Sequence, residues 1–316
     1  MQVRQVPKLA IIGAGAVGSS LAYASLIRGV ARHVVLHDVN AAKVRAEALD
    51  MAHGSQFFPQ ASVEGSDDVD ITRGSDVVVI TAGAKQKPGE TRMDLAASTV
   101  ALMKKVIPPL VERSPDAIFM LVTNPVDVTT YAALQISGLP RNQVFGSGTV
   151  LDSSRLRFLV AQHCGVAVRN VHAYMCGEHG DSELPMWSSA TIGGVPLMEW
   201  ETQTGRLGER ERDDIADRVV NAAYEVIEGK GATNLAIGLS STEIIEAILR
   251  NEHRVLPVSS LIEDWHGISG VCLSAPTLVD SDGVGRVLPL PMTDGELAAM
   301  HDSADIIRAT QRSLGF

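Results

Sequence analysis

Three glycines at a fixed spacing stand near the start of the chain. Gly13-Ala14-Gly15-Ala16-Val17-Gly18 follows an apolar run and opens an amphipathic stretch, which is the context in which a G-x-G-x-x-G sequence binds a dinucleotide. The first glycine allows a tight turn, the second lets a pyrophosphate reach the backbone, and the third lets a helix close on a strand. The helix N-terminus would offer N–H groups to the phosphates. A tight turn without a ligand is the alternative.

An acidic residue stands where the next apolar run ends. Asp38 lies about 20 residues beyond Gly18, where a carboxylate would accept hydrogen bonds from the adenosine ribose. A 2′-phosphate about 4 Å away would be opposed by about 4 kcal/mol per charge at an effective dielectric of about 20. The sequence therefore favours NAD over NADP, with a solvated aspartate as the alternative. We expect other cofactor contacts from this half of the chain at Gly13, Gly15, Val17, Gly18, Thr81, Ala82 and Gly83.

Reduction of a ketone needs a hydride, here from a nicotinamide, and a proton for the new alkoxide. A histidine, whose pKa lies near neutral pH, is a natural proton donor. His179 stands between two glycines in a polar segment, where an ordinary histidine of a surface loop is the alternative. Asp152 and Arg155 stand three residues apart on one predicted helix face. By themselves they could be a surface ion pair worth about 0.2–0.5 kcal/mol.

Four polar segments follow one another along the chain: 83–92, 123–127, 151–155 and 177–181. In these segments the sequence resembles the L-lactate/malate dehydrogenase family, and the resemblance runs nearly end to end. It implies that His179 is the catalytic proton donor and acceptor and that Asp152 binds the other nitrogen of its ring. It implies also that Arg155 clamps the substrate carboxylate through two N–H groups, a geometry that lysine cannot reproduce.

The resemblance assigns further roles around the substrate. It implies that the loop ending at Arg92 closes over the substrate and brings this arginine to polarise the carbonyl, although such a loop is otherwise a solvated connection. It implies a cis bond at Asn124-Pro125, with the asparagine near the nicotinamide and the reacting oxygen; a plain turn is the alternative. Thr233 would line the substrate pocket, cap the helix after it, or do both. Ile237 would pack against the nicotinamide.

Within this family the same loop decides the substrate. Malate dehydrogenases place an arginine where this chain has Gln86, and that arginine pairs the second carboxylate of oxaloacetate. A neutral Gln86 would leave this carboxylate unpaired in a closed site, which is costly. The resemblance therefore implies reversible hydride transfer between NADH and pyruvate, giving L-lactate. Because Lys85 and Lys87 flank the glutamine, malate dehydrogenase activity or a broader 2-hydroxy-acid range is the alternative. Family members often carry aromatic residues where this chain has Asn234-Leu235, so the pocket could also accept larger keto acids.

Two basic residues match positions where many bacterial family members bind fructose 1,6-bisphosphate between two subunits. Arg157 follows Arg155 by two residues, about 200° around the same helix, so it can face a neighbouring subunit while the other faces the substrate. His172 is the second matching residue, and ordinary surface basic residues are the alternative. The resemblance also implies a homotetramer with two-fold interfaces. A non-catalytic NAD-binding protein is a further alternative, but it predicts a damaged active site, whereas the residues that the resemblance assigns to catalysis are all present.

The elements that must position these residues follow from the hydrophobic pattern. In the first half, short apolar runs alternate with amphipathic stretches, which predicts a parallel sheet covered by helices on both faces. We expect strands at 8–12, 33–37, 76–80 and 117–122, and helices at 16–29, 41–53, 93–112 and 126–137.

From about Gly148 the pattern changes. The expected fold class is α/β, with a Rossmann-type doubly wound parallel sheet over residues 1–148 and a C-terminal α+β substrate domain over residues 149–316. In the second half we expect helices at 152–163, 208–229, 234–250 and 293–313, strands at 171–176 and 187–191, and an antiparallel meander at 254–261, 267–276 and 285–290.

Composition restricts the remaining possibilities. The chain has 316 residues and a formal net charge of −10, and it contains no long basic run, so we expect no nucleic-acid or membrane partner. Its three cysteines are scattered, without the spacing of a zinc site or a disulfide framework. We therefore expect no metal and a cytoplasmic location.

Overall fold

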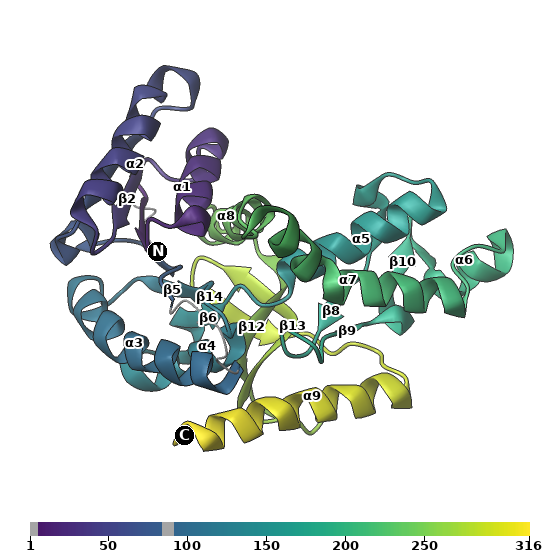
Figure 1. Ribbon diagram of the computed structural model, residues 1–316. Coiled ribbons are helices and arrows are strands. Elements are labelled where there is room, and N and C mark those ends of the chain that lie inside the picture. Colours follow the sequence, from purple (N-terminus) through teal and green to yellow (C-terminus); the bar gives the residue numbers. More distant parts are fainter. Residues whose placement is uncertain (1–5, 84–91) are drawn as a thin grey trace.

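The computed structural model describes residues 6–83 and 92–316, with side chains resuming at Met93 after the gap. In this part of the chain a nine-stranded sheet carries helices on both faces (Figure 1). Six of its strands are parallel, in the order β3-β2-β1-β4-β5-β6, which is the order of dinucleotide-binding folds. The predicted parallel sheet is thus confirmed. These strands are β1 (Lys8–Ile12), β2 (His33–His37), β3 (Ser62–Ser66), β4 (Val77–Ile80), β5 (Ile118–Leu121) and β6 (Val144–Gly146).

The central parallel strands β1, β4 and β5 are apolar on both faces, and successive side chains point to opposite sides of the sheet. Leu9 and Ile11 of β1 share a buried cluster with helices α1, α2 and α8. Ala10 and Ile12 share another cluster with α3 and α4 on the opposite face. Helices therefore cover both sides, as the sequence predicts. They are α1 (Ala16–Arg28), α2 (Ala41–His53), α3 (Arg92–Arg113), α4 (Val126–Ser137) and α8 (Leu235–Leu249).

The hydrophobic pattern does not predict two strands of this sheet. Strand β3 has the polar sequence SVEGS and is only partly buried, because it lies at the edge of the sheet. Strand β6 has three residues, too few for a recognisable apolar run. Both strands are defined by pairing with a neighbour rather than by their own composition.

The sheet continues into the second half of the chain. Three antiparallel strands confirm the predicted meander, and Ser259 of β12 pairs with Gly146 of β6. The two halves therefore share one sheet. The meander consists of β12 (Arg254–Ile262), β13 (Val271–Asp280) and β14 (Gly283–Val287).

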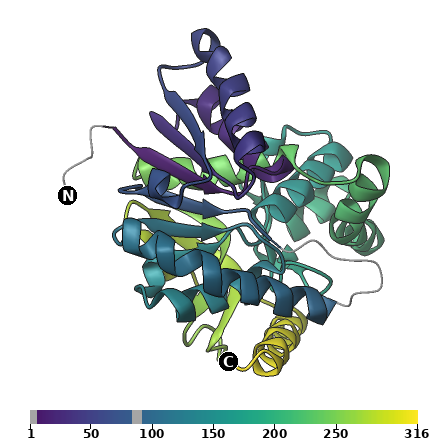
Figure 2. The same cartoon turned by 60° about the vertical axis from the view of Figure 1, so that its left-hand side comes forward.

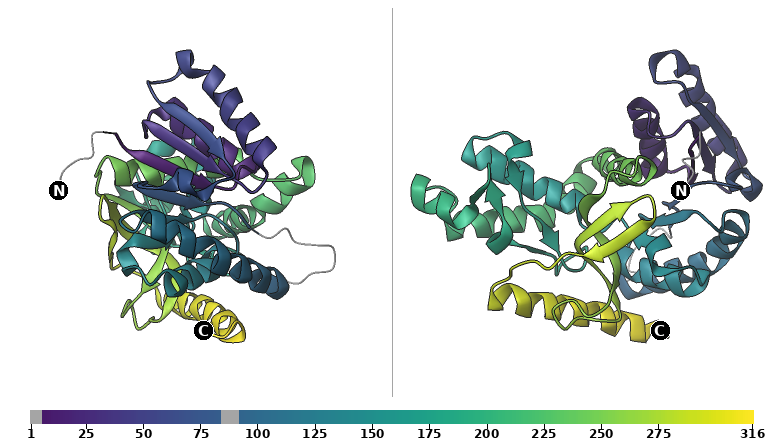
Figure 3. Two further views of the ribbon diagram at one scale, coloured as in Figure 1. Left: turned by 90° about the vertical axis from the view of Figure 1, so that its left-hand side faces the viewer. Right: turned by 180° about the vertical axis from the view of Figure 1, so that it is seen from behind.

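Four further helices and several short strands complete the second half. Helices α5, α6 and α7 extend to one side of the sheet (Figure 3), and α9 lies beside the start of α3 (Figure 2), where Ser313 Oγ donates a hydrogen bond to Met93 Sδ (3.0 Å). None of the described helices is long and apolar enough to cross a membrane. The four helices are α5 (Val150–Cys164), α6 (Leu197–Thr204), α7 (Glu209–Lys230) and α9 (Asp294–Ser313).

Some expectations for this half are wrong. The predicted strand 171–176 is two strands, β7 (Val171–His172) and β8 (Met175–Cys176), because each pairs with a different partner. The predicted strand 187–191 is a 3₁₀ turn followed by β10 (Thr191–Ile192), and α6 was not predicted. Helix α8 has Asn234 as its N-cap residue, without a side-chain cap bond, so the alternative in which Thr233 caps this helix is wrong.

Candidate active site

The glycine turn lies between β1 and α1, at the carboxyl edge of the parallel strands. Gly13 has a φ of +105° and donates its N–H to His37 O (2.8 Å). A Cβ on Gly18 would lie 1.9 Å from the oxygen of Gly13, whereas a Cβ on Gly15 would meet nothing within 4 Å. The turn is thus closely packed against the protein and open above Gly15, the N-cap residue of α1. This shape fits a pyrophosphate at the helix N-terminus.

Asp38 lies beside this turn, directly after β2. Its Oδ2 accepts a hydrogen bond from Ala14 N (2.8 Å) and its Oδ1 accepts one from Asn40 N (2.9 Å). Each carboxylate oxygen can accept a further bond, so both can also serve ribose hydroxyls. The structure therefore brings the carboxylate and the glycine turn together, and these residues fit NAD.

The segment that follows β4 borders the same turn. Thr81 Oγ1 donates to the carbonyl oxygens of Ile12 and Gly13, both at 3.0 Å. A Cβ on Gly83 would lie 2.6 Å from Thr123 Cγ2, so the chain passes close to the end of β5 there. Thr123 Oγ1 in turn donates to Ala82 O (2.8 Å). These bonds hold the ends of three neighbouring parallel strands together beside the expected cofactor.

A cavity of about 690 Å³ lies where α4, α5 and the loop of His179 meet. Its apolar side is formed by residues such as Val128, Ile227 and Ile306. A peptide bond at Asn124-Pro125, on the same cavity, is cis as expected. The cavity also collects four of the predicted site residues: Asn124, Asp152, Arg155 and His179.

His179 is held from two sides. Its Nδ1 lies 2.8 Å from Oδ2 of Asp152, which is 1% exposed. Its backbone N–H donates to Asp127 Oδ2 (2.8 Å). Because Nδ1 faces a carboxylate, the other ring nitrogen is the one available for a proton transfer.

The neighbouring charges change the proton affinity of this pair. Burial alone would lower the pKa of His179, but the charge and hydrogen bond of Asp152, and then the carboxyl group of Glu183, hold that pKa well above its ordinary value of 6.5. Burial alone would raise the pKa of Asp152, yet the imidazole and then the guanidinium of Arg155 lower it. The geometry therefore favours an imidazolium beside a carboxylate, which suits a proton donor.

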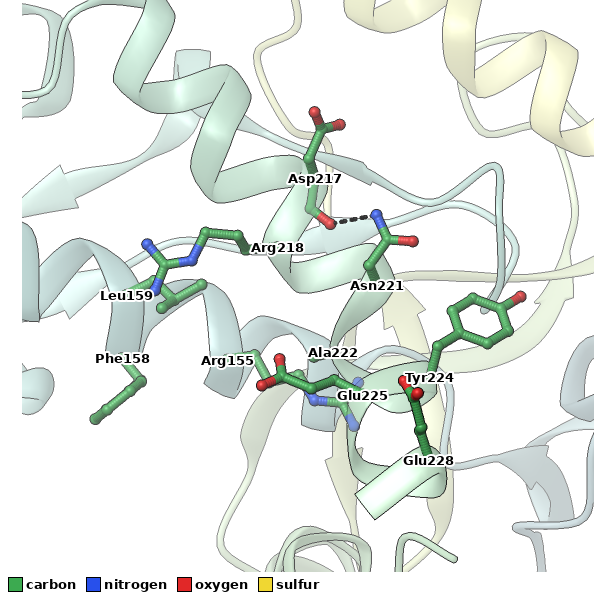
Figure 4. Close-up of a pocket in the computed structure, with 10 residues that line it drawn as sticks. All are labelled: Arg155, Phe158, Leu159, Asp217, Arg218, Asn221, Ala222, Tyr224, Glu225 and Glu228. Atoms are coloured by element: carbon green, nitrogen blue, oxygen red, sulfur yellow. Dashed lines mark hydrogen bonds between the residues drawn. The ribbon is translucent and has the colours of Figure 1, made fainter. Parts of the chain in front are cut away.

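Arg155 lies between two cavities. Its Nη1 contacts Asp152 Oδ1 at 2.5 Å, so the expected ion pair is present. It borders the 690 Å³ cavity and also a second one of about 540 Å³ between α5 and α7, where Glu225 and Glu228 are further lining residues (Figure 4). A guanidinium has five N–H donors, so a pair with Asp152 is compatible with binding a substrate carboxylate.

Comparison with known families decides what this arrangement belongs to. A sequence model described as the lactate/malate dehydrogenase NAD binding domain matches residues 7–146. A second one, described as the alpha/beta C-terminal domain of lactate/malate dehydrogenase, matches residues 149–313. The chain belongs to the lactate/malate dehydrogenase family. The predicted family, the fold class and NAD as the cofactor are confirmed.

Individual family members are similar over their whole length. The chain is 56% identical over 311 residues to an L-lactate dehydrogenase of Bifidobacterium animalis subsp. lactis, covering 98% of this chain and 97% of that protein. The crystal structure of the minor L-lactate dehydrogenase from Enterococcus mundtii in a ligands-bound form has a TM-score of 0.95 at 40% identity, covering 98% and 99%. MGS-M5, a lactate dehydrogenase from a Medee basin deep-sea metagenome library, has a TM-score of 0.96 at 35% identity, covering 99% and 100%.

Other residues expected from the lactate/malate dehydrogenase family lie away from the cavity or outside the described part of the chain. Gln86 and the side chain of Arg92 lie outside the described residues. Val17 is half-buried in the first turn of α1. Thr233 and Ile237 are half-buried around the start of α8, and neither is among the described residues that line the 690 Å³ cavity.

The two residues expected to bind an effector lie on neighbouring elements, Arg157 on α5 and His172 on β7. Arg157 Nε donates to Ala173 O (2.9 Å), and its guanidinium lies 5.2 Å from the centre of the Tyr174 ring. Burial lowers the pKa of Arg157. His172 is exposed on β7. Arg157 therefore points away from the cavity that holds Arg155, as the helix periodicity predicts.

Sequence reasoning missed two buried carboxyl groups of this site. Asp127 is 1% exposed, accepts a hydrogen bond from Ser259 Oγ (2.6 Å) and binds the backbone of His179. Glu183 is 8% exposed, and its Oε2 lies 3.7 Å from His179 Nδ1. Asp127 ends the recognised segment 123–127, and Glu183 follows the recognised segment 177–181 by two residues. Asp127 stands six residues after the end of β5, and Glu183 stands four residues after His179; these positions are the only sequence signals that could have indicated them.

Proposed function

We propose that this chain is an NAD-dependent L-lactate dehydrogenase, which transfers a hydride reversibly between NADH and pyruvate. The observation that carries the proposal is the 2.8 Å contact between His179 Nδ1 and Asp152 Oδ2 on a cavity that Arg155 also lines. A proton donor and a carboxylate-binding cation thus face one space. The L-lactate dehydrogenases named above, similar over nearly the whole chain, support this choice within the family.

The residues of the chain divide the work as follows. Bound NADH supplies the hydride. Arg155 binds the carboxylate of pyruvate, and Arg92, whose side chain lies outside the described residues, polarises the ketone. His179 delivers its proton to the new alkoxide, and Asp152 fixes the ring and stabilises its charged form. Asn124 stands beside the reacting oxygen.

The remaining site residues complete the proposal. Gln86, a neutral side chain, gives preference to pyruvate over oxaloacetate, and Thr233 contributes to the substrate pocket. Ile237 packs against the nicotinamide. The expected contacts to the rest of NAD come from Gly13, Gly15, Val17, Gly18, Asp38, Thr81, Ala82, Gly83 and Asn124. The domains are residues 1–148 and 149–316, in a cytoplasmic homotetramer.

The test is NADH oxidation by the purified protein with pyruvate and oxaloacetate compared at several concentrations. We expect a large preference for pyruvate in kcat/KM, and Gln86→Arg should reverse it. His179→Asn removes the proton donor and should lower kcat about 10²–10⁴-fold. Comparable or greater activity of the unchanged enzyme with oxaloacetate would assign it to malate or to a broader set of 2-hydroxy acids.

We propose further that fructose 1,6-bisphosphate binds at Arg157 and His172 between two subunits. The position of Arg157 supports this site, because its side chain donates a hydrogen bond to the carbonyl oxygen of Ala173, the residue after His172. We expect the effector to lower the KM for pyruvate and to favour the tetramer in sedimentation experiments. Arg157→Gln should abolish both effects. If saturating effector changes neither quantity in the unchanged enzyme, this part of the proposal fails.

A further inference from the structure

Glu183 is a buried carboxyl group directly beside the imidazole of His179. It stands four residues after the histidine, and its side chain is 3% exposed. Its Oε2 lies 3.7 Å from His179 Nδ1, longer than a hydrogen bond. This oxygen has no hydrogen-bond partner among the residues that the structure describes. Burying an unpartnered carboxyl oxygen is costly, so a packing role alone does not explain it.

The three groups form one compact cluster. Single ligand atoms of Asp152, His179 and Glu183 lie within 4.8 Å of one another. The 2.8 Å between Asp152 Oδ2 and His179 Nδ1 is the distance of a hydrogen bond, so a proton lies between these two atoms. His179 therefore has two carboxyl groups on the same nitrogen, one bonded and one near.

We propose that Glu183 is a positioning residue that acts through the His179 imidazole and sets the pH range in which this ring holds its proton. The inference rests on the proposed function for its consequence in catalysis. Burial raises the pKa of Glu183 to about 7, with the imidazole opposing this rise and the Asp152 charge adding to it. Above neutral pH Glu183 is thus ionised, and its charge favours the imidazolium.

Other charged groups in the described part of the chain face this cluster, and none of them replaces Glu183. Arg155 on α5 contacts Asp152 and opposes the rise in the pKa of Glu183. Asp127 on α4 contacts the backbone of His179, not its ring. Among the residues that the structure describes, the remaining charged or titratable groups on this cavity are Glu178 and Asp181 of the same loop and Tyr224 of α7, of which Tyr224 OH donates to Asp181 Oδ1 (3.2 Å).

The first test is the pH profile of Glu183→Gln, which keeps the shape of the side chain and removes its charge. Loss of the charge lowers the proton affinity of His179, so the alkaline limb of kcat/KM for pyruvate should move to lower pH by about one unit or more. The limb for lactate oxidation, which needs the neutral ring, should move in the same direction. Glu183→Asp, which restores a carboxyl group, should recover part of the shift.

Glu112→Gln, the same change at a side chain 79% exposed at the end of α3, serves as the control and should leave both limbs in place. A merely structural Glu183 would change kcat uniformly or lower stability. Unmoved limbs in a folded Glu183→Gln variant therefore overturn the proposal.

A second measurement needs neither a variant of Glu183 nor activity. The ring of His179 is followed by NMR in ¹³C-histidine-labelled protein as pH is raised, with its signal assigned from His179→Asn. Coupled groups titrate in more than one step, so the His179 signal should respond near pH 7, where Glu183 ionises, and again at higher pH. A single step at the ordinary histidine pKa overturns the proposal. If pyruvate reduction itself is absent, this titration still decides the link between the two residues.

Discussion

Asp127 holds the loop of His179 in place, but its carboxyl group is buried, and burial destabilises the ionised form. Its carboxyl group accepts one hydrogen bond from the backbone N–H of His179 and another from the hydroxyl of Ser259. Burial raises the pKa of Asp127 to about 6, although both hydrogen bonds oppose the rise. Folding therefore favours the protonated form of this residue, which is the reverse of the usual behaviour of a paired aspartate.

Asp127→Asn should reveal this penalty as a pH-dependent stability difference. The folded-state pKa lies above the unfolded value of 3.8, so this carboxyl group makes the wild type lose stability as pH rises from about 4 to 7, and the variant lacks this contribution. The free energy of unfolding of the variant relative to the wild type should rise by up to about 3 kcal/mol over this range. Denaturant unfolding at pH 4, 5, 6 and 7 measures it.

Asp116→Asn, at an exposed residue, is the control for this experiment and should give a difference that does not change with pH. A flat or falling difference for Asp127→Asn would mean that the carboxyl group is ionised in the folded protein without penalty.

Residue chemistry predicts the recognised part of the site better than its supporting part. Asp152, Arg155 and His179 stand in polar segments whose residue types suggest proton transfer and carboxylate binding, and the structure brings them to one cavity. Asp127 and Glu183 escape prediction because an acidic side chain is normally exposed. Asp127 is buried because it lies between Ser259 of β12 and the loop of His179. Glu183 is buried where that loop meets Asp152 of α5.

At the scale of elements, two glycines of the β1–α1 turn have different roles, one in packing and one in binding the cofactor. Gly18 has no room for a Cβ, whereas Gly15 has room and a φ of −81° that alanine can adopt. Gly15→Ala should therefore leave the melting temperature of the cofactor-free protein nearly unchanged but weaken NADH binding at least about tenfold, because its methyl group occupies the expected phosphate position. Gly18→Ala should lower the melting temperature strongly. Thermal unfolding and NADH fluorescence titration give both values.

An equal loss of stability in the two variants would show that the space above Gly15 is needed by the protein itself. Unchanged NADH affinity in Gly15→Ala would place the phosphates elsewhere.

The same contrast explains which elements the sequence predicts. Strands β1 and β2 and helices α2 and α4 have the predicted bounds, because buried apolar runs and end signals such as Gly138, with its φ of +64°, act locally. Strands β3 and β6 depend on a neighbour, and the two-residue strands around β7 and β10 depend on each other. No local pattern contains that information.

Over the whole molecule, one helix joins the two halves. Helix α8 comes from the second half but packs in the same buried cluster as α1 and the parallel strands. Glu246, 6% exposed, pairs there with Arg28 of α1 and with Arg250. Together with the shared sheet, this contact should make the chain unfold as one unit rather than as two domains.

Glu246→Gln tests this coupling. Removing the carboxylate leaves two guanidinium groups beside a neutral amide, and because both are partly exposed we expect a loss of about 2 kcal/mol, less than for a fully buried pair. The urea transition should move as a whole and stay single. The control is Glu243→Gln on the same helix. Glu243 pairs with Arg254, and both side chains are 37% exposed, so this change should lower the free energy of unfolding by no more than about 1 kcal/mol. Two separate transitions in Glu246→Gln, by fluorescence and circular dichroism, would show instead that the shared sheet alone does not couple the halves.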